Sequence, residues 1–489
     1  MIEKEMQSLA VSLPEDILKA KWAGDQKRAL RLIDRYLSQD STPEYIKTRL
    51  RIEKEILERF FLDYAFSEEE AVAFVQREIP DFSLEELESW MDKGTVEWTY
   101  INGRPYLAAR FYEALQDVYP EIARRAGKIE QNFEETPGSI LKNEHIRKIK
   151  SSGQTAQHIR LKMSVRIKDE FFSKGKVMVH LPLPKPQINM KNIRVVSTYP
   201  EASKTCQVLI GSEEQAARTV CFLEEMTVNH PFSVEFEYDC TADFADLTKP
   251  ASKEVTDAFM RAKEPLVERF VVRDDDLAQL PPHIMFTPTV TELVRELTEG
   301  MEDDLSKARA FYDYITTKIT YCYMRQYFTL ERIPEYAILG RKGDCGVQAL
   351  TFVTLCRAAG IPARWQSALY VTPDVVDDDG NVLQKAEGGM PDWAMVYLKP
   401  WGWRFVDASF GGSAYRAGNL ERWNYYFGNL DPFRMAANDA FQAPLYPEKK
   451  MTRFDPYDNQ VGEIEYEDRP VSRFEMDRRI DVLEHYPID

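Results

Sequence analysis

The chain has 489 residues, which is too many for a single hydrophobic core and predicts several domains. Hydrophobic residues make up 44% of it and aromatic residues 12%, which excludes an intrinsically disordered chain. The formal net charge is −17, without a long acidic or basic block, and this argues against nucleic-acid and anionic-membrane partners. No apolar run approaches the ~20 residues of a membrane span, and the first residues lack a signal-peptide pattern. We therefore expect a cytoplasmic protein whose six cysteines are free thiols.

Residues 1–130 are predicted to form a helical domain with a small hairpin. Apolar residues recur at helical spacing early in this region, and Ser67 and Ser83 each precede acidic residues, as N-caps do. Asn102-Gly103 lies between aromatic-rich segments and predicts a tight hairpin turn. Helices followed by a hairpin resemble a winged-helix arrangement, but the acidic charge favours a packing or protein-contact module over DNA binding.

In the middle of the chain, a polar segment is followed by segments in which apolar and polar residues alternate. Residues 131–157 are polar, with Pro-Gly-Ser and Ser-Ser-Gly clusters, and predict a linker. Between 158 and 245 apolar and polar residues alternate in short segments, which predicts an antiparallel β-sandwich. The tail, 413–489, is first aromatic-rich and later charged. It predicts either a cap over the preceding domain or an extension that wraps the protein.

Residues 246–412 contain the most informative motif, Gly343-Asp344-Cys345-Gly346, which precedes a long apolar run. The motif predicts a loop that delivers Cys345 to the first turn of a buried helix. Around it the patterns predict helices over 289–297 and 305–319, and strands over 363–371, 393–398 and 403–407. The predicted fold class is therefore α+β in a multidomain chain.

Cys345 is a candidate nucleophile because a helix N-terminus favours a thiolate over a thiol. A thiol nucleophile also needs a base to accept its proton and a third group to orient that base. The chain has six histidines, and the sole one after Cys345 is His485. No histidine therefore stands at the expected spacing, and His180 or His283 would have to be brought in from elsewhere.

Four segments together carry a resemblance to a known family. They are the cysteine motif, the run Leu355 to Arg364 after it, the pattern Trp-x-x-Val-Tyr-Leu from Trp393, and the pattern Gly-Trp-x-x-Val-Asp ending at Asp407. The family that they resemble is the transglutaminase-like superfamily. The resemblance covers about 290–410. The superfamily includes bacterial cysteine proteases and amidases. It implies a papain-like α+β core in which Cys345 is the nucleophile and Asp407 the orienting carboxylate. A β-sandwich ahead of this core is common among the bacterial members.

The resemblance places the family histidine two residues before Trp393, where this chain has Pro391. The neighbouring Asp392 is a possible substitute, although we expect it to point to the opposite face of the strand unless a bulge turns it inward. The resemblance also implies that Tyr321 and Tyr323 supply a donor to the oxyanion. Trp393 and Trp403 are candidate substrate-binding residues, although core packing explains them more simply.

Two hypotheses from different classes follow. In the first, the protein is a cysteine-dependent hydrolase or acyltransferase that acts on amide bonds through a Cys345 thioester. In the second, it is a catalytically degenerate domain that serves as a scaffold for a peptide, protein or glycan. A redox-sensing thiol is a weaker third possibility. We expect no cofactor and no metal, since no acidic loop has calcium-ligand spacing. The expected partner is a peptide or protein, and the oligomeric state is open.

Overall fold

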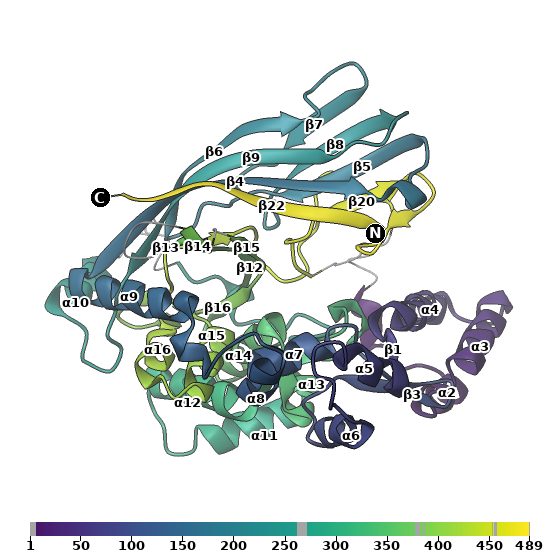
Figure 1. Cartoon of the computed structure of the whole chain (residues 1–489), viewed down its shortest axis with the longest axis horizontal. Helices are drawn as coiled ribbons and strands as arrows, with labels where there is room; N and C mark the ends of the chain where they lie inside the picture. The colour runs from purple at the N-terminus through teal and green to yellow at the C-terminus, as the bar shows by residue number, and fades with distance from the viewer. Residues whose placement is uncertain are drawn as a thin grey trace.

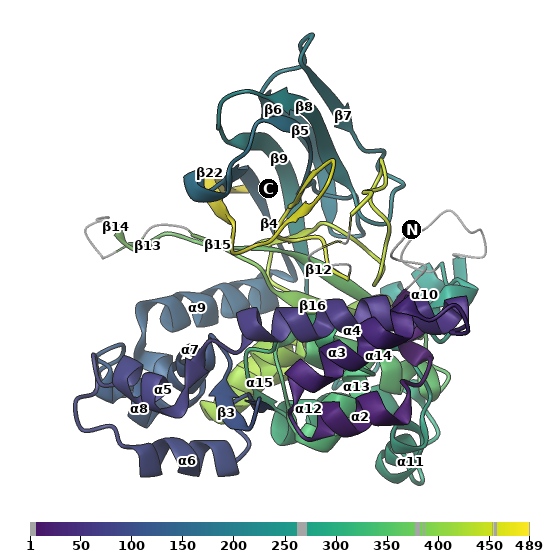
Figure 2. The same ribbon diagram turned by 90° about the vertical axis from the view of Figure 1, so that its right-hand side faces the viewer.

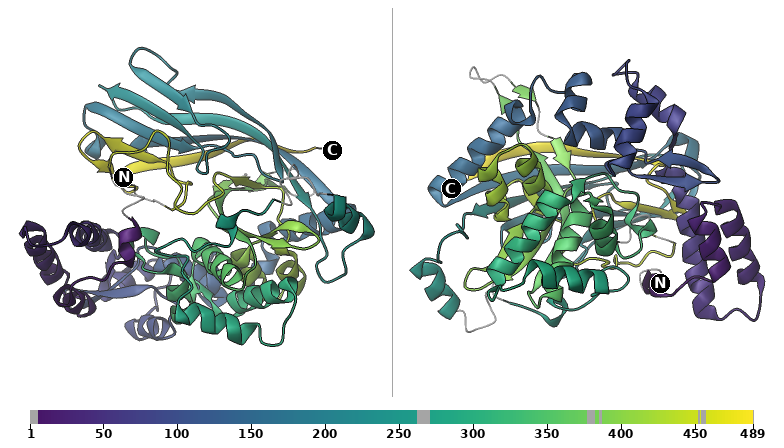
Figure 3. Two further views of the ribbon diagram at one scale, coloured as in Figure 1. Left: turned by 180° about the vertical axis from the view of Figure 1, so that it is seen from behind. Right: turned by 90° about the horizontal axis from the view of Figure 1, so that it is seen from below.

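The computed structural model describes residues 6–261, 271–376, 382–384, 387–451, 453 and 457–488. Figure 1 shows a β-sandwich lying above a body of helices that surrounds a smaller sheet. From behind and from below, the N-terminal helices, in purple, form a lobe at one side of that body (Figure 3). The α+β fold class and the multidomain organisation predicted from the sequence are confirmed.

The N-terminal lobe is helical with one small sheet, as predicted. Asp25, Ser67 and Ser83 each cap a helix with their side chains, and Ser67 forms a reciprocal capping box with Glu70. The predicted hairpin is strands β2 and β3, which join β1 in a three-stranded sheet. The elements are α2 (Glu15–Trp22), α3 (Gln26–Ser38), α4 (Glu44–Asp63), β1 (Phe66–Ser67), α5 (Glu68–Val75), α6 (Leu84–Asp92), β2 (Trp98–Ile101), β3 (Arg104–Leu107), α7 (Phe111–Val118) and α8 (Pro120–Arg125).

The linker predicted over 131–157 is wrong for most of its length. Helix α9 (Pro137–Ser152) occupies it, with Thr136 as the N-cap and Gly153 as a left-handed C-cap. Ile146 and Ile149 of this helix are buried in the core beneath the sandwich. The helix lies between the sandwich and the body below it (Figure 2). The exposed face of the helix is polar, and for that reason the composition of this segment was the same as that of a linker.

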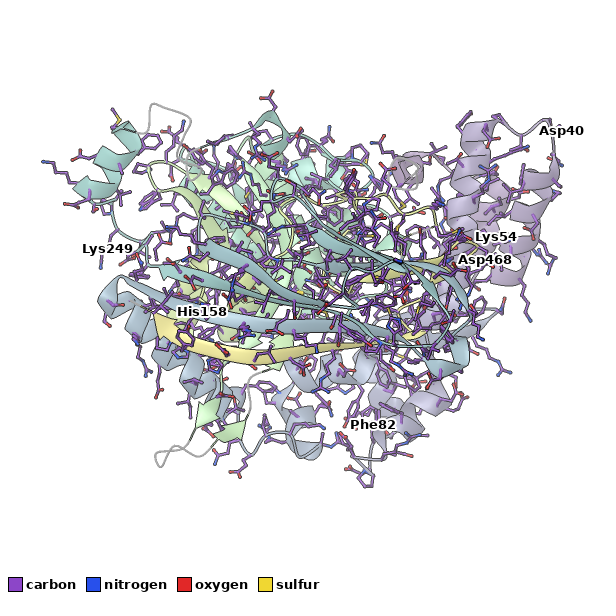
Figure 4. All side chains as sticks on the ribbon, turned by 90° about the horizontal axis from the view of Figure 1, so that it is seen from above. Asp40, Lys54, Phe82, His158, Lys249 and Asp468 are labelled. Carbon is purple, nitrogen blue, oxygen red and sulfur yellow. The ribbon has the colours of Figure 1, made fainter. Side chains whose placement is uncertain are left out.

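The sandwich is built from both the middle and the end of the chain. One sheet has the order β21-β20-β5-β8-β7 and the other the order β22-β4-β9-β6. Strand β22 pairs antiparallel with β4 along almost its whole length, and His158 lies at this seam (Figure 4). The tail therefore wraps the protein and completes the sandwich predicted at 158–245. The strands are β4 (Gln154–Ile167), β5 (Gly175–Pro182), β6 (Met190–Tyr199), β7 (Cys206–Ile210), β8 (Thr219–Met226), β9 (Phe232–Asp243), β20 (Glu463–Tyr466), β21 (Pro470–Val471) and β22 (Met476–Ile488).

The lower body contains a mixed core of one sheet and several helices. The sheet has the order β15-β12-β16-β17-β18, and β19 also pairs with β12. Helix α14 packs on one face of this sheet, and the opposite face packs toward the sandwich. Remaining elements are α10 (Lys253–Arg261), α11 (Pro288–Leu297), α12 (Asp304–Lys318), β10 (Thr320–Tyr321), α13 (Ile333–Gly340), β11 (Lys342–Gly343), α14 (Cys345–Ala358), β12 (Ala363–Thr372), β13 (Val375–Val376), β14 (Val382–Gln384), β15 (Glu387–Gly389), β16 (Asp392–Leu398), β17 (Gly402–Val406), α15 (Ala408–Arg416), α16 (Leu420–Tyr425), β18 (Phe427–Gly428) and β19 (Arg434–Ala436).

Side chains of β16 alternate between the two faces. Ala394 and Val396 belong to the hydrophobic cluster around α14, whereas Trp393 and Met395 belong to the cluster beneath the sandwich. This period of two is that of a regular strand. It decides which residue of the strand can reach Cys345. Within the described residues, no helix combines the length and apolar character needed to cross a membrane.

Candidate active site

Cys345 is the first residue of α14, as the sequence predicted. The preceding Asp344 is the N-cap, and its side chain accepts a hydrogen bond from the Val347 N–H at 3.2 Å. Strand β11 leads into this turn and pairs in parallel with β10, which carries Tyr321. The helix is buried along nearly its whole length, while the Cys345 side chain is partly exposed at its start. The thiol is therefore held at the rim of the core.

Asp392 is the side chain of β16 that reaches the thiol. The Cys345 Sγ donates to Asp392 Oδ2 at 3.6 Å, and Gln460 Nε2 donates to Asp392 Oδ1 at 2.8 Å. The ladder between β12 and β16 is regular where it pairs Ser367 with Asp392, so no bulge is needed. The expectation that Asp392 points away from Cys345 unless a bulge turns it inward is wrong. Extending the alternation of β16 by one residue, to Pro391 just before the strand, predicts that a side chain at 391 points to the opposite face.

Carboxylates dominate the electrostatics of the thiol. Burial raises the pKa of Cys345 well above its ordinary value, and the negative charges of Asp392, Asp344 and Asp407 raise it further. These contributions outweigh the helix N-terminus, which by itself favours a thiolate. The helix position favours a thiolate, whereas burial and the neighbouring carboxylates favour the protonated thiol.

Tyr327 binds the N-cap residue of α14, and it was not identified from the sequence. Its hydroxyl donates to Asp344 Oδ1 at 2.5 Å, and the Met324 N–H donates to Asp344 Oδ2 at 3.2 Å. A Cβ at Gly346 would lie 2.3 Å from Tyr327 Oη and 2.6 Å from Asp392 Oδ2. The glycine after the cysteine is thus required by the close approach of these two side chains. Tyr327 carries no sequence signal that distinguishes it from a core tyrosine.

Asp407 is buried, and its carboxylate binds an arginine rather than a histidine. It caps α15 by accepting from the Phe410 N–H at 2.9 Å, and it also accepts from Ser409 Oγ at 2.8 Å. Its Oδ2 accepts from Arg434 Nη1 at 2.8 Å, and neither side chain is exposed. Arg434 also donates to Asp431. The carboxylate that the resemblance assigns to orienting a histidine therefore binds a guanidinium, which sequence reasoning missed.

The histidines considered as substitute bases do not lie at the thiol. His283 accepts from the Ile333 N–H and donates to the Tyr457 hydroxyl at 2.8 Å, and burial lowers its pKa to about 3. Burial likewise lowers the pKa of His180 to about 3, and its ring contacts Thr219 in the sandwich. His485 lies on β22 and binds Asp374 at 3.0 Å. Of the candidate bases named from the sequence, Asp392 is the one in contact with Cys345.

The two tyrosines of the preceding segment differ in their surroundings. Burial raises the pKa of Tyr321, and a thiolate at Cys345 would raise it further, so Tyr321 keeps its hydroxyl proton. Tyr323 instead donates to Asp117 of the N-terminal lobe at 2.8 Å, and the Arg110 guanidinium lies 3.4 Å above its ring. Tyr321 is therefore a candidate oxyanion donor, whereas Tyr323 fixes this segment to the lobe.

The two candidate substrate-binding tryptophans are core residues. Trp393 is 1% exposed and donates its indole N–H to Gln366 Oε1 at 2.7 Å. Trp403 is 0% exposed and donates to the Val271 carbonyl at 2.8 Å. Neither indole presents a surface to a substrate, so the assignment of these residues to substrate binding is wrong.

A buried ionic cluster ties the N-terminal lobe to the strand that precedes Cys345. Glu97, just before β2, binds Lys342 Nζ of β11 at 2.7 Å and accepts from the hydroxyls of Tyr64 and Tyr336. Burial opposes the charge of Glu97, but Lys342 and Arg325 hold its pKa below the usual range. The cluster fixes β11 and hence the turn that carries the thiol. No group of metal-binding side chains occurs among the described residues.

Comparison with known proteins identifies the family of this segment. Residues 291–408 match the sequence profile of the transglutaminase-like superfamily. No curated protein matches the chain. A candidate cysteine protease from Cytophaga hutchinsonii is a similar solved structure, with 14% identity, 69% of this chain and 91% of that chain covered, and a TM-score of 0.40.

The periplasmic domain of TgpA from Pseudomonas aeruginosa shares 15% identity over 57% of this chain and 95% of that chain, with a TM-score of 0.26. A candidate protease from Parabacteroides distasonis shares 11% identity over 52% of this chain and 64% of that chain, with a TM-score of 0.20.

Proposed function

Residues 291–408 of the chain carry a transglutaminase-like core, and from this premise we propose that the protein is a cysteine-dependent hydrolase or acyltransferase acting on amide bonds. The observation that supports this most is the contact between the Cys345 thiol and the Asp392 carboxylate at 3.6 Å. It gives the nucleophile a proton acceptor, the role for which the resemblance implies a histidine.

The proton path follows from this pair. As the sulfur attacks an acyl carbon, the thiol proton passes to Asp392 Oδ2, and the protonated carboxyl group then gives it to the leaving amine. The product of this step is a thioester on Cys345 and a free amine. Water completes hydrolysis, and a second amine completes transfer. Gln460 holds the other carboxylate oxygen, so Oδ2 stays directed at the sulfur.

The start of α14 supplies donors for the oxyanion of the tetrahedral intermediate. The first N–H groups of a helix have no intrahelical acceptor, and Cys345 and Gly346 are the first two residues of α14. The Tyr321 hydroxyl is a further candidate donor, because β10 pairs with the strand that leads into Cys345. Removal of one oxyanion donor typically costs about 10²–10³ in kcat.

The second candidate function is a binding scaffold for a peptide or protein. Two observations favour it: carboxylates raise the pKa of the Cys345 thiol, and Asp407 is bound to Arg434 rather than to a base. The first makes the thiol a slow nucleophile, and the second leaves Asp407 without a base to orient. In this case the surface around Cys345 recognises its ligand without turnover. All six cysteines are free, which agrees with action in a reducing compartment such as the cytoplasm.

One experiment separates the two functions. The protein is incubated with an activated acyl donor, such as a peptide p-nitrophenyl ester, in the presence of hydroxylamine as the amine acceptor. An enzyme forms an acyl adduct on Cys345, detected by mass spectrometry, and releases the hydroxamate; C345S forms neither. If wild type and C345S release hydroxamate at the same rate and no adduct forms on residue 345, the enzyme proposal fails and the scaffold remains.

A further inference from the structure

A cavity of about 220 Å³ lies beneath the first half of α9, away from Cys345. Helix α9 lies between the sandwich and the lower body at this place (Figure 2). An adjoining groove of about 460 Å³ shares several of its residues, including Leu141 and His145, so the cavity has an approach from outside. The polar side chains that line the cavity are Thr136, Ser139, Lys142, His145, Tyr370, Thr372 and Asp431.

Lys142 lines this cavity without an ionic partner. Within the described part of the chain its Nζ makes no hydrogen bond or ion pair, and it lies 4.5 Å from the centroid of the Phe410 ring. The nearby carboxylates of Asp407 and Asp431 are both held by Arg434. The lysine amine is thus free to meet a ligand in the cavity.

The surroundings of Lys142 favour the neutral amine. Burial lowers its pKa to about 8; the positive charges of Arg422 and Arg434 act in the same direction, and the carboxylates of Asp431 and Asp407 oppose them. About a quarter of the amine is then neutral at pH 7.5, against roughly one part in a thousand for an ordinary lysine of pKa ~10.4. Desolvation beside another cation is the usual way in which a protein makes a lysine nucleophilic.

We propose that this cavity binds a small aldehyde or ketone, which forms a Schiff base with the Nζ of Lys142. The amine nitrogen attacks the carbonyl carbon, and both hydrogens of the neutral amine leave with the carbonyl oxygen as one molecule of water. A neutral carbonyl compound suits the site better than an anion, since Asp407 and Asp431 present two carboxylates to one Arg434 guanidinium. The cavity holds about the volume of seven water molecules, which limits the ligand to a small compound.

The test uses the full chain and reductive trapping. The protein is incubated with propanal and sodium cyanoborohydride at pH 7.5, and the propylated lysines are quantified by peptide mass spectrometry over time. Lys148, on the same helix but exposed, is the internal control. We expect modification of Lys142 at least tenfold faster than of Lys148, with the rate at Lys142 half-maximal near pH 8.

A K142R variant extends the test without removing the positive charge. It is expected to lose the adduct at position 142 while Lys148 reacts as in wild type. Modification of Lys142 no faster than of Lys148, or a rate at Lys142 that is still rising steeply at pH 9.5, overturns the proposal. Neither result depends on the chemistry of Cys345.

Discussion

Replacing Asp392 by asparagine separates the charge of this side chain from its shape. Asparagine keeps the size of aspartate and an oxygen that accepts from Gln460, but it carries no negative charge and accepts a proton poorly. The substitution therefore removes the carboxylate from the thiol with little change in packing. Its effects on alkylation and on acyl transfer are expected to have opposite signs.

The magnitude for alkylation follows from the distance. Two unit charges 3.6 Å apart repel by about 4–5 kcal/mol at an effective dielectric of ~20. Because Cys345 is partly exposed, solvent screening reduces this to about 2 kcal/mol, which is roughly thirtyfold in the thiolate population. At pH 8 the D392N variant should thus react with iodoacetamide about thirtyfold faster than wild type.

Acyl transfer should change in the other direction. Loss of a general base typically costs about 10²–10⁴ in rate, so D392N should release hydroxamate at least a hundredfold more slowly than wild type. The assay measures both rates on the same preparations, with C345S as the blank for the other cysteines. If D392N alkylates no faster than wild type, the electrostatic reasoning is refuted. If it transfers acyl groups as fast or faster, Asp392 is not the base.

The strand geometry predicts that D392H places an imidazole at the thiol and raises acyl transfer at least tenfold. P391H, on the opposite face, should not raise it. Hydroxamate release by the two variants checks this. A methyl group at Gly346 would lie 2.3 Å from a tyrosine hydroxyl, so G346A should lose at least tenfold in acyl transfer, while G340A, with no atom closer than 3.8 Å, should keep wild-type turnover. The pKa of His283 is about 3 in the folded protein and ~6.5 in the unfolded one, so the unfolded state gains a proton first as the pH falls. From pH 6.5 to 5.0 this contribution should lower the free energy of unfolding of the wild-type protein by roughly 1.6 kcal/mol. Urea titration at the two pH values should show that H283Q loses less stability than wild type over this range, by the same amount.

Much of the fold followed from local patterns. The N-caps at Ser67 and Ser83, the hairpin turn at Asn102-Gly103 and the helix beginning at Cys345 all depend on neighbouring residues, and each occurs where the sequence predicts it. Helix α9 was missed because polar residues outnumber its buried isoleucines. The return of the tail to β4 was left open because strand pairing over 300 residues has no local signal.

The site was harder to predict because its chemistry is set by contacts between distant segments. Cys345 and Asp392 were named from the sequence, but the choice between residues 391 and 392 depends on which face of β16 packs against α14. The pairing of Asp407 with Arg434 joins a helix cap to a strand 27 residues away, and nothing in either segment announces it.

The carboxylates around Cys345 point to a single physical constraint on any chemistry here. A cysteine–histidine pair stores a thiolate before the substrate arrives, whereas a thiol beside a carboxylate cannot, because the thiolate would face a second negative charge at 3.6 Å. The proton must then leave the sulfur as the new bond forms. Turnover at this site is therefore expected to depend on substrates with reactive acyl groups. Simple alkylating agents, which require a preformed thiolate, should react slowly.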